Sequence, residues 1–488
     1  MTSPARVRAG ERPRSRAVVL GGGLAGMLTA AAMDGLVDEI TVVERDVLPD
    51  GPVPRRSLPQ ARHTHLLWSG GARAFEELIP GITERWIAAG ARRIPLPTGL
   101  VTLSSQGWFR RWPQTQFTIA CTRDLLDSVL REQVLGRPAV TLLQGFAVES
   151  LAGSADRVTG VRVSGPGGRE LTLAADLVVD ACGQGSRAVG WLGELGVDGI
   201  EEGRVDSGLV YATRLYRAPA NSGDFPVVNV QANPGDPVPG RTATLVPVEG
   251  GLWMVTLSGT RGGRPSADPE EFEPYARSAV RHPVVGELIS RAVPLSDEVA
   301  VTRSTVNRRR WFERAPRWPE GFIAVGDSVA TYNPVYGQGM SVAAQGLVGL
   351  RGALLRHRPD EPGFARRVQR AVSRPVSVAW DLATSTDIQY PGAVGQGPVA
   401  GSALVNRYAT RLTYGATGRA RLTRAFLDVI TLSRPLSSWL HPDIVVAALR
   451  GPGRSPLTGP PLTEEELKIV SGGGSPPLTG FPLEPHDM

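Results

Sequence analysis

The sequence is nearly free of lysine, and this scarcity bears on which partners the protein can have. Lys468 is the only lysine among 488 residues, so the 53 basic residues are almost all arginines, scattered singly or in pairs apart from the run Arg308 to Arg310. Basic residues that are not interleaved with aromatics on a known binding module argue against nucleic-acid binding, despite a net charge of +6. We therefore expect a solvated arginine-rich surface and no nucleic-acid partner.

Cysteine and long apolar runs are also scarce. Cys121 and Cys182 offer neither a disulfide framework nor zinc-ligand spacing, which fits a reducing cytoplasm. No apolar run reaches the roughly 18 residues that a bilayer-spanning helix needs, so we expect no transmembrane segment. Residues 1–15 are arginine-rich without the apolar centre of a signal peptide, and we interpret them as a disordered N-terminus. The remaining length suffices for two domains with a substantial core.

A glycine-rich turn follows the first apolar segment of the chain, RAVVL. Gly21, Gly23 and Gly26 have the G-x-G-x-x-G spacing and lead into a helix-forming stretch that starts with Leu24 and Ala25. Glu44 ends the next apolar segment, eighteen residues after Gly26, where an acidic residue binds ribose hydroxyls in dinucleotide-binding folds. This context predicts a dinucleotide site.

A second turn lies between the apolar run 321–325 and the small, apolar helical stretch that starts at Ser341. It reads GDSVATYNPVYGQGM, from Gly326 to Met340. Asp327 is placed to accept a hydrogen bond from a ribityl or ribose hydroxyl. Pro334, Gly337 and Gly339 allow the backbone to approach a flat ring closely. The helix that follows directs N–H groups towards negative charge.

The third turn, LVVDACGQGSR, places Asp180 at the end of an apolar segment and Gly183 three residues later. In their order along the chain, the G-x-G-x-x-G turn, the Asp180 turn and the Gly326–Met340 turn resemble the FAD-dependent monooxygenases of the aromatic hydroxylase and squalene epoxidase type. The runs LPQARHTHLLWSGG (58–71) and TIACTR (118–123) look like the bacterial polyene epoxidases of polyether-ionophore biosynthesis, of the monensin and lasalocid type.

This resemblance implies an α/β fold, in which a glutathione-reductase-like, Rossmann-type FAD domain carries an inserted, mostly antiparallel substrate sheet and a C-terminal helical region. The implied boundaries are a disordered 1–15, FAD-binding segments 16–95, 121–190 and 301–356, substrate-domain strands 96–120, a substrate-binding sheet 191–300, a helical region 357–450 and a flexible tail 451–488. The implied cofactor contacts are Gly21, Gly23, Leu24, Ala25, Gly26, Glu44, Arg45, Arg62, Arg123, Ala147, Asp180, Gly183, Gly326, Asp327, Pro334, Gly337, Gly339 and Met340.

The resemblance further implies oxygen transfer from a flavin 4a-hydroperoxide to the C=C bonds of a large apolar polyene, such as a polyether precursor. FAD and O2 are then required, with NAD(P)H as direct or indirect reductant. Because only one dinucleotide fingerprint is present, reduction by transiently bound NAD(P)H and by a separate flavin reductase both remain open. A carrier protein could deliver the substrate. No catalytic side chain is expected; the loop of Pro334, Gly337, Gln338 and Gly339 supports the flavin's own chemistry.

Aromatic residues are the candidates for the substrate pocket, which we expect to be an apolar wall above the flavin. Ordinary sheet packing is the competing interpretation for each of them. His63 and His65 have no carboxylate nearby, so we interpret them as loop anchors and expect no metal site. The candidate substrate residues are Trp68, Trp108, Phe117, Tyr211, Trp253 and Tyr332.

Several alternatives share the fold. An aromatic hydroxylase would use a more polar pocket, a prenyl or polyene reductase would need no oxygen, and a non-redox binding protein would not keep the whole Gly326–Met340 turn. A halogenase is disfavoured because the W-x-W-x-I-P motif is missing and the only lysine lies near the C-terminus. The helices of 357–450 could close the pocket or touch a membrane or a partner.

Overall fold

In the computed structural model, which describes residues 14–55, 57–220, 222–303, 305–396 and 402–471, a five-stranded parallel sheet carries all three glycine-rich turns. Its strand order is β21 (Phe322–Ala324), β12 (Leu177–Asp180), β1 (Arg16–Leu20), β2 (Glu39–Glu44) and β8 (Val140–Gln144). Residues 17–20 are buried on both faces of the sheet, as the continuous apolar run of a central parallel strand requires. The carboxyl ends of these parallel strands share one edge, where ligands bind in such sheets.

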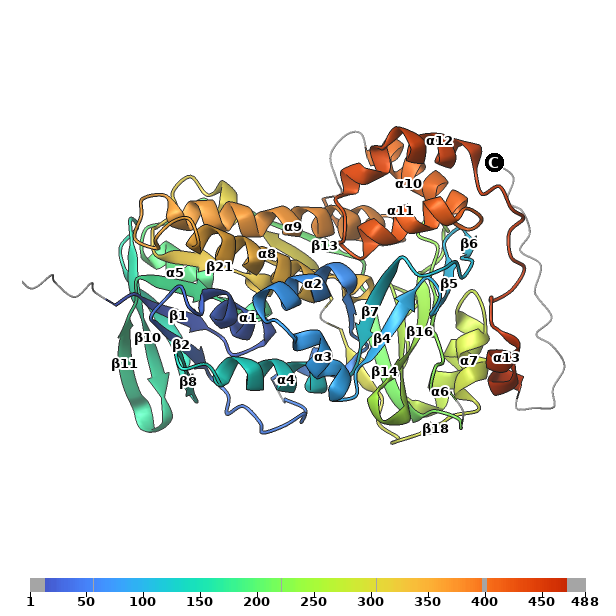
Figure 1. The fold of residues 1–488 in the computed structure, drawn as a ribbon, viewed down its shortest axis with the longest axis horizontal. Coiled ribbons are helices and arrows are strands. Elements are labelled where there is room, and N and C mark those ends of the chain that lie inside the picture. Colours follow the sequence, from blue (N-terminus) through green and yellow to red (C-terminus); the bar gives the residue numbers. More distant parts are fainter. Residues whose placement is uncertain (1–13, 56, 221, 304, 397–401, 472–488) are drawn as a thin grey trace, which may run out of the picture.

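Helices and a small antiparallel sheet enclose the parallel sheet (Figure 1). The helices are α1 (Leu24–Met33), α2 (Ser69–Leu78), α3 (Ile82–Ala88), α4 (Arg123–Leu135), α5 (Ala188–Glu194) and α8 (Gly339–Leu354). Thr122 caps α4 with its side chain, which accepts from the Leu125 amide, as its position before the helix predicts. The antiparallel sheet is β11 (Arg169–Ala174), β10 (Val158–Gly165) and β9 (Ala147–Gly153), at the far left of Figure 1.

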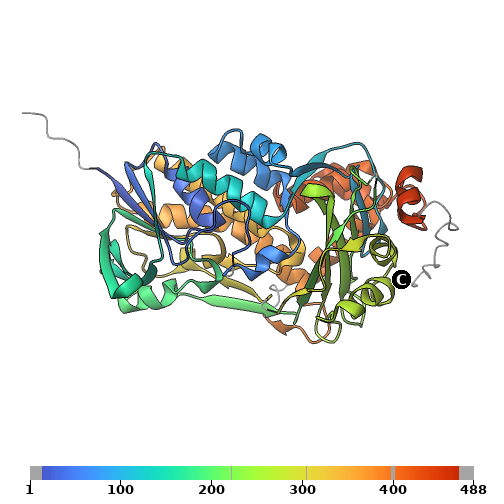
Figure 2. The same cartoon turned by 90° about the horizontal axis from the view of Figure 1, so that it is seen from below.

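The other half of the molecule is an eight-stranded, mostly antiparallel sheet (Figure 2). Its order is β18 (Val293–Pro294), β14 (Val210–Arg217), β17 (Leu252–Gly259), β16 (Arg241–Val248), β15 (Val227–Val230), β5 (Leu100–Ser104) and β6 (Gly107–Trp108), and β19 (Ala300–Thr302) also pairs with β14. The helices α6 (Pro269–Pro274) and α7 (Val284–Ile289) pack on one face. α6 continues directly into a π-helical turn, Tyr275–Ala279, and Val280 then leaves the helical conformation, so α7 begins separately after Pro283.

Two smaller sheets connect the halves. One is β3 (Leu66–Trp68), β7 (Gln116–Ala120) and β4 (Arg92–Leu96), and the other is β22 (Ala330–Thr331), β20 (Asn307–Arg310), β13 (Glu202–Asp206) and β23 (Val394–Gly395). The second sheet carries the chain out to the eight-stranded sheet and back. The α/β fold with an inserted antiparallel sheet, expected from the sequence, is confirmed.

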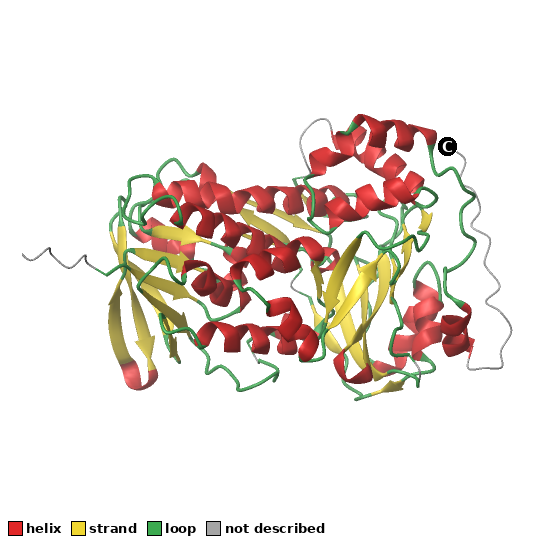
Figure 3. Ribbon diagram, viewed as in Figure 1, coloured by secondary structure: helices red, strands yellow, loops and turns green. Residues whose placement is uncertain are grey.

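The C-terminal region is helical, as expected, and lies along the upper edge in Figure 3. The long α9 (Phe364–Asp387) packs on α8, and α10 (Ser402–Ala416), α11 (Ala420–Ile430) and α12 (Pro442–Arg450) share their own apolar core. Within the described ranges, no helix is long and apolar enough to cross a membrane.

The last described segment differs from the flexible tail that we expected over 451–488. Leu457 and Leu462 pack against the core of the eight-stranded sheet, and α13 (Glu464–Ser471) follows. Glu466 also forms an ion pair with Arg111, in which both side chains are largely buried. These contacts anchor 451–471; residues 1–13 and 472–488 lie outside the described residues.

Candidate functional site

The N-terminus of α1 is shaped for a diphosphate. Gly21 has φ +101°, and a Cβ there would lie 2.7 Å from the Ala181 carbonyl oxygen. A Cβ at Gly26 would collide with the Gly21 carbonyl oxygen, whereas one at Gly23 would meet nothing within 4 Å. No side chain caps α1 and its first turn holds no acid, so the N–H groups of Leu24 and Ala25 point into open space. This open, positively polarised helix end fits the diphosphate of FAD.

Glu44 lies beside this turn, and a residue that the sequence did not suggest accompanies it. Its buried carboxylate accepts from the Gly22 amide at 2.8 Å and lies 3.1 Å from the Arg55 guanidinium. Arg55 also donates to Asp46. Arg55 comes from an irregular loop without periodicity, so no sequence signal singles it out. Arg45, predicted as a contact, has a mostly exposed side chain 3.8 Å from Asp46.

Asp180 faces the protein and not the open site. Its buried carboxylate accepts from the Cys182 amide at 3.0 Å and from the Ser186 and Ser328 hydroxyls. Burial raises the pKa of Asp180, although these donors lower it. Arg310, also buried, donates to the carbonyls of Ser328 and Ser186. Asp180 therefore fastens the third turn to the second.

Asp327 is the carboxylate that remains available to a ligand. No hydrogen bond to its side chain is present among the described residues, and it is only partly shielded from solvent. Burial raises the pKa of Asp327 to about 6, against the opposing effect of Arg123 and Arg308. Arg123 is held by Asp127, with Nε and Oδ1 2.7 Å apart. Gly339 lies next to Asp327, since a Cβ there would be 3.9 Å from Oδ1.

Three of the other predicted contacts lie in different surroundings. Arg62 is an exposed residue paired with Glu298 of the eight-stranded half, so in this structure it does not line the turn. Ala147 is exposed and offers only backbone, at the start of β9. Met340 is buried in the core beneath α8.

The loop between β22 and α8 is anchored from several sides. Gly337 has φ +62°, a left-handed conformation that favours glycine. The Trp68 indole donates to the Tyr336 carbonyl at 3.1 Å, and the buried Gln338 amide donates to the Ile430 carbonyl at 3.1 Å. Pro334 is exposed. The Trp68 and Gln338 side chains thus hold the loop.

A buried carboxylate at the end of α9 also holds this loop. Asp387 Oδ2 accepts from Asn307 Nδ2 at 2.6 Å and from Asn333 Nδ2 at 2.9 Å, and Oδ1 accepts from the Tyr336 hydroxyl at 2.7 Å. Burial raises the pKa of Asp387, although its donors lower it. The Tyr211 hydroxyl donates to Asn333 Oδ1 at 2.7 Å. The loop is thereby joined to strand β14.

The two faces of the eight-stranded sheet differ sharply. Trp108 and Trp253 are buried in the core that faces α6 and α7. The expectation that these two line the substrate pocket is wrong, because alternation along β6 and β17 directs them away from the flavin loop. Phe117 lies under the Arg93 guanidinium, 4.1 Å from the ring centroid. Tyr211 lies on the opposite face, and Tyr332 donates to the Val376 carbonyl.

The face that carries Tyr211 is apolar in one part, where Val246 and Met254 belong to a buried cluster, and polar in another. A row of cross-strand neighbours runs over five strands, and all its members are polar: Thr102, Asn229, Thr244, Thr256 and Thr213. The Asn229 side-chain oxygen is buried and has no hydrogen-bond partner among the residues that the structure describes. A buried acceptor without a donor is costly, so this row can take a ligand that donates a hydrogen bond. We call these five residues the polar row.

His63 connects the loop before β3 to this row. Its two ring nitrogens lie 2.7 Å from the hydroxyls of Thr213 and Thr302, and His65 Nδ1 lies 2.7 Å from the His63 carbonyl. Burial lowers the pKa of His63 to about 4, so the imidazole is neutral at pH 7. No cluster of potential metal ligands occurs among the described residues.

No protein-family model matches this chain. Protein Rv3254 of Mycobacterium tuberculosis is 30% identical over 395 residues, which cover 79% of this chain and 82% of that protein. A kynurenine 3-monooxygenase of Salinispora tropica is 26% identical over 434 residues, 82% and 86% of the two chains.

Solved structures share the fold. A flavin-dependent brominase, Bmp2, superposes with a TM-score of 0.62 at 15% identity, covering 89% of this chain and 98% of Bmp2. PqsL of Pseudomonas aeruginosa, described as a probable FAD-dependent monooxygenase, gives 0.56 at 17% identity over 77% and 97%. The chain belongs to the same family as protein Rv3254, within the FAD-dependent monooxygenase superfamily.

Proposed function

We propose that the protein transfers one oxygen atom from O2 to an unsaturated carbon of a substrate that lies between the flavin loop and the polar row. The observation that carries this proposal is the hydrogen bond from Tyr211 to Asn333, which brings the polar face of the sheet next to the loop. The second oxygen atom leaves as water, with two electrons from NAD(P)H, taken directly or through a separate flavin reductase. When bound and reduced, the flavin supplies the activation of dioxygen.

The residues of this chain bind, orient and shield. The N-terminus of α1 would hold the diphosphate, Glu44 the ribose hydroxyls and Asp327 a ribityl hydroxyl, and the backbone of Gly337 to Gly339 leaves room for the ring. The side chains that anchor the loop fix its backbone before any ligand arrives, and such preorganisation is what oxygen transfer needs from the protein. No proton-transferring side chain is required at the reacting carbon.

Two substrate classes remain, and the polar row favours one of them. A phenol or aniline ring brings an O–H or N–H donor that Asn229 Oδ1 can accept, which supports aromatic hydroxylation. The similarity to a kynurenine 3-monooxygenase also supports aromatic hydroxylation. Epoxidation of a large apolar polyene, delivered free or on a carrier protein, rests on the short runs at 58–71 and 118–123. Reduction without oxygen is the weaker alternative on this fold.

Products will decide between the two classes. We expect the FAD-loaded protein, given NADPH, a flavin reductase and 18O2, to add one 18O atom to an aminoaromatic substrate such as kynurenine, as read by mass spectrometry. Asn229→Leu should raise KM about tenfold, since it removes the acceptor, without changing the protein's flavin content. Thr410→Val, which removes a hydroxyl on α10, is the matched control. An epoxide formed from a linear polyene, with no ring hydroxylation, would instead establish the epoxidase.

The affinity for FAD should fall as the pH falls through about 6. Burial raises the pKa of Asp327 to about 6. In the protein without FAD, ionisation of this buried carboxyl therefore lowers the free energy of unfolding as the pH rises towards 6. A ribityl hydroxyl that donates to the ionised carboxylate favours the charged form. We expect about tenfold weaker FAD binding at pH 5 than at pH 7, measured by flavin fluorescence quenching. Asp327→Asn should bind weakly at both values; an unchanged pH profile in this variant would assign the titration to another group.

A further inference from the structure

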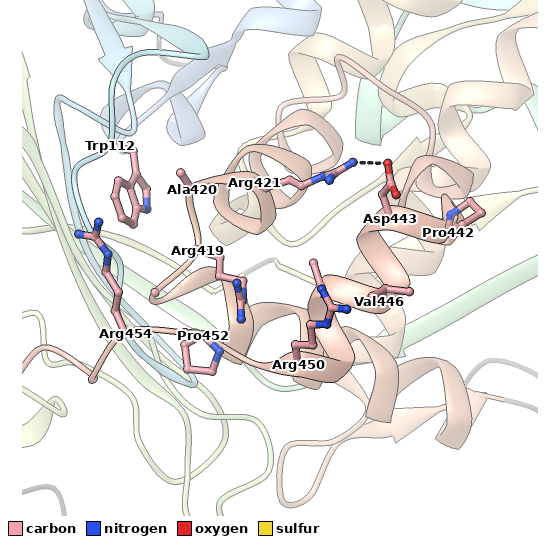
Figure 4. Close-up of a pocket in the computed structure, with 13 residues that line it drawn as sticks. Trp112, Arg419, Ala420, Arg421, Pro442, Asp443, Val446, Arg450, Pro452 and Arg454 are labelled. Atoms are coloured by element: carbon pink, nitrogen blue, oxygen red, sulfur yellow. Dashed lines mark hydrogen bonds and ion pairs between the residues drawn. The ribbon is translucent and has the colours of Figure 1, made fainter.

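We propose that a pocket in the C-terminal helical region binds a phosphate-bearing small molecule. The pocket has a volume of about 700 Å3, within the range of small-molecule sites, and lies between α11, α12, the segment after α12 and the loop before β7 (Figure 4). None of its lining residues belongs to the three glycine-rich turns. The pocket is therefore separate from the FAD site, and the proposal that it binds a phosphate does not rest on the proposed function.

The pocket carries an excess of positive charge. Four arginines line it, Arg419, Arg421, Arg450 and Arg454, against a single carboxylate, Asp443. Asp443 pairs with Arg421, as the dashed line in Figure 4 shows, which leaves the other three guanidinium groups uncompensated. Arg450 has no hydrogen bond or ion pair among the described residues. Adjacent guanidinium groups without a counterion attract an anion.

One of these arginines is already held in position. The Arg419 Nε donates to the Gly451 carbonyl, and its guanidinium carbon is so close to Gly453 that a Cβ there would lie 2.8 Å away. This leaves its terminal nitrogens for a ligand at little further entropic cost. In Figure 4, Arg419 and Arg450 extend into the same space from the start of α11 and the end of α12. A phosphate group has enough acceptor oxygens to bridge both.

The wall opposite Arg419 and Arg450 would contact the part of the ligand beyond the phosphate. The buried indole N–H of Trp112 has no acceptor in the described part of the chain, and Arg454 lies 4.9 Å from the indole ring centroid. Val446 and Pro452 add apolar surface. Donors outnumber acceptors throughout, so the ligand must bring acceptors, and its phosphate could belong to a free nucleotide or to a nucleotide coenzyme such as NADPH or coenzyme A. The shared chemistry is a diphosphate joined to a nucleoside.

Titration calorimetry on FAD-loaded protein from which free FAD has been removed tests this, because the other dinucleotide site is then filled and no free FAD competes for the pocket. We expect inorganic diphosphate and ADP to bind with Kd on the order of 0.1 mM at low ionic strength, and more weakly in 0.5 M salt. Arg450→Gln should weaken binding about tenfold or more while the unfolding temperature stays unchanged, since Arg450 is exposed. Val446→Glu, also at an exposed position, should abolish it by adding a carboxylate to the pocket. Competition by NADPH and by coenzyme A then distinguishes the sources of the phosphate.

Arg370→Gln is the matched control, because it removes an exposed arginine on α9 outside the pocket. It should leave the binding of diphosphate and ADP unchanged. The proposal is overturned if neither probe binds, or if Arg450→Gln and Arg370→Gln have equal effects, which would indicate only non-specific attraction to an arginine-rich surface.

Discussion

Replacing Gly26 by alanine is expected to give a protein that holds no flavin. The added Cβ would collide with the Gly21 carbonyl oxygen, so α1 would have to move away from β1. Both elements lie in the central core, and the displaced helix would no longer direct its N–H groups at the diphosphate. We expect unfolding free energy to fall by at least about 3 kcal/mol. The ratio of visible flavin absorbance to protein absorbance, together with the thermal midpoint, measures both effects.

Gly190→Ala provides the comparison for this variant. Gly190 lies within α5, and a Cβ there would meet nothing within 4 Å. A helical glycine replaced by alanine in open space is neutral or stabilising by up to about 1 kcal/mol, so flavin content should stay at the wild-type level. If Gly26→Ala retained flavin to the same extent as Gly190→Ala, α1 would not be the diphosphate site.

Replacing Asp387 by alanine is the second change with a large expected effect. It would leave the Asn333 amide without its acceptor, and it would leave Asn307 and Tyr336 only their longer hydrogen bonds, to the carbonyls of Val205 and Ala383. Each unsatisfied buried donor costs about 1–3 kcal/mol, and we expect a total loss of about 3–5 kcal/mol in urea unfolding. Because Asn333 and Tyr336 belong to the flavin loop, FAD affinity should fall as well, measured by equilibrium dialysis.

Asp381→Ala separates this role from a general effect on α9. Asp381 lies on the same helix, is exposed, and has no hydrogen bond to its side chain among the described residues. Its removal should change stability by less than about 0.5 kcal/mol and leave FAD binding intact. Equal destabilisation by the two variants would show that Asp387 does not position the loop.

The cofactor half of the molecule could be read largely from the sequence, because its signals are local. Gly26 is required by its contact with Gly21 in the same strand–turn–helix unit, and the next strand carries Glu44, whereas the contact that requires Gly21 is with Ala181 of another turn. Asp180 was identified as part of the site on the same grounds, yet its oxygens are taken by Ser186 and Ser328. A motif places a carboxylate at a strand end, but only its neighbours decide which way it faces.

The substrate half was harder to predict, since a sheet has two faces and alternation alone does not tell which one packs on helices. Trp108 and Trp253 were expected at the pocket and lie instead in the core under α6 and α7. Asn229 attracted no attention in the sequence, because a single asparagine in an apolar strand has no pattern. Its significance depends on four neighbours from four other strands.

By itself, the sequence determined the α/β fold, the three turns and hence the superfamily, because these depend on glycine positions and on hydrophobic periodicity along short segments. Only the tertiary structure decided what lies around the turns. Asp387 reaches Asn333 across 54 positions, and Tyr211 reaches it across 122. The arginines of the pocket in the C-terminal helical region come from two helix ends and the segment after α12. Contacts between such distant segments follow from how helices and sheets pack, and no local pattern in the chain encodes that packing.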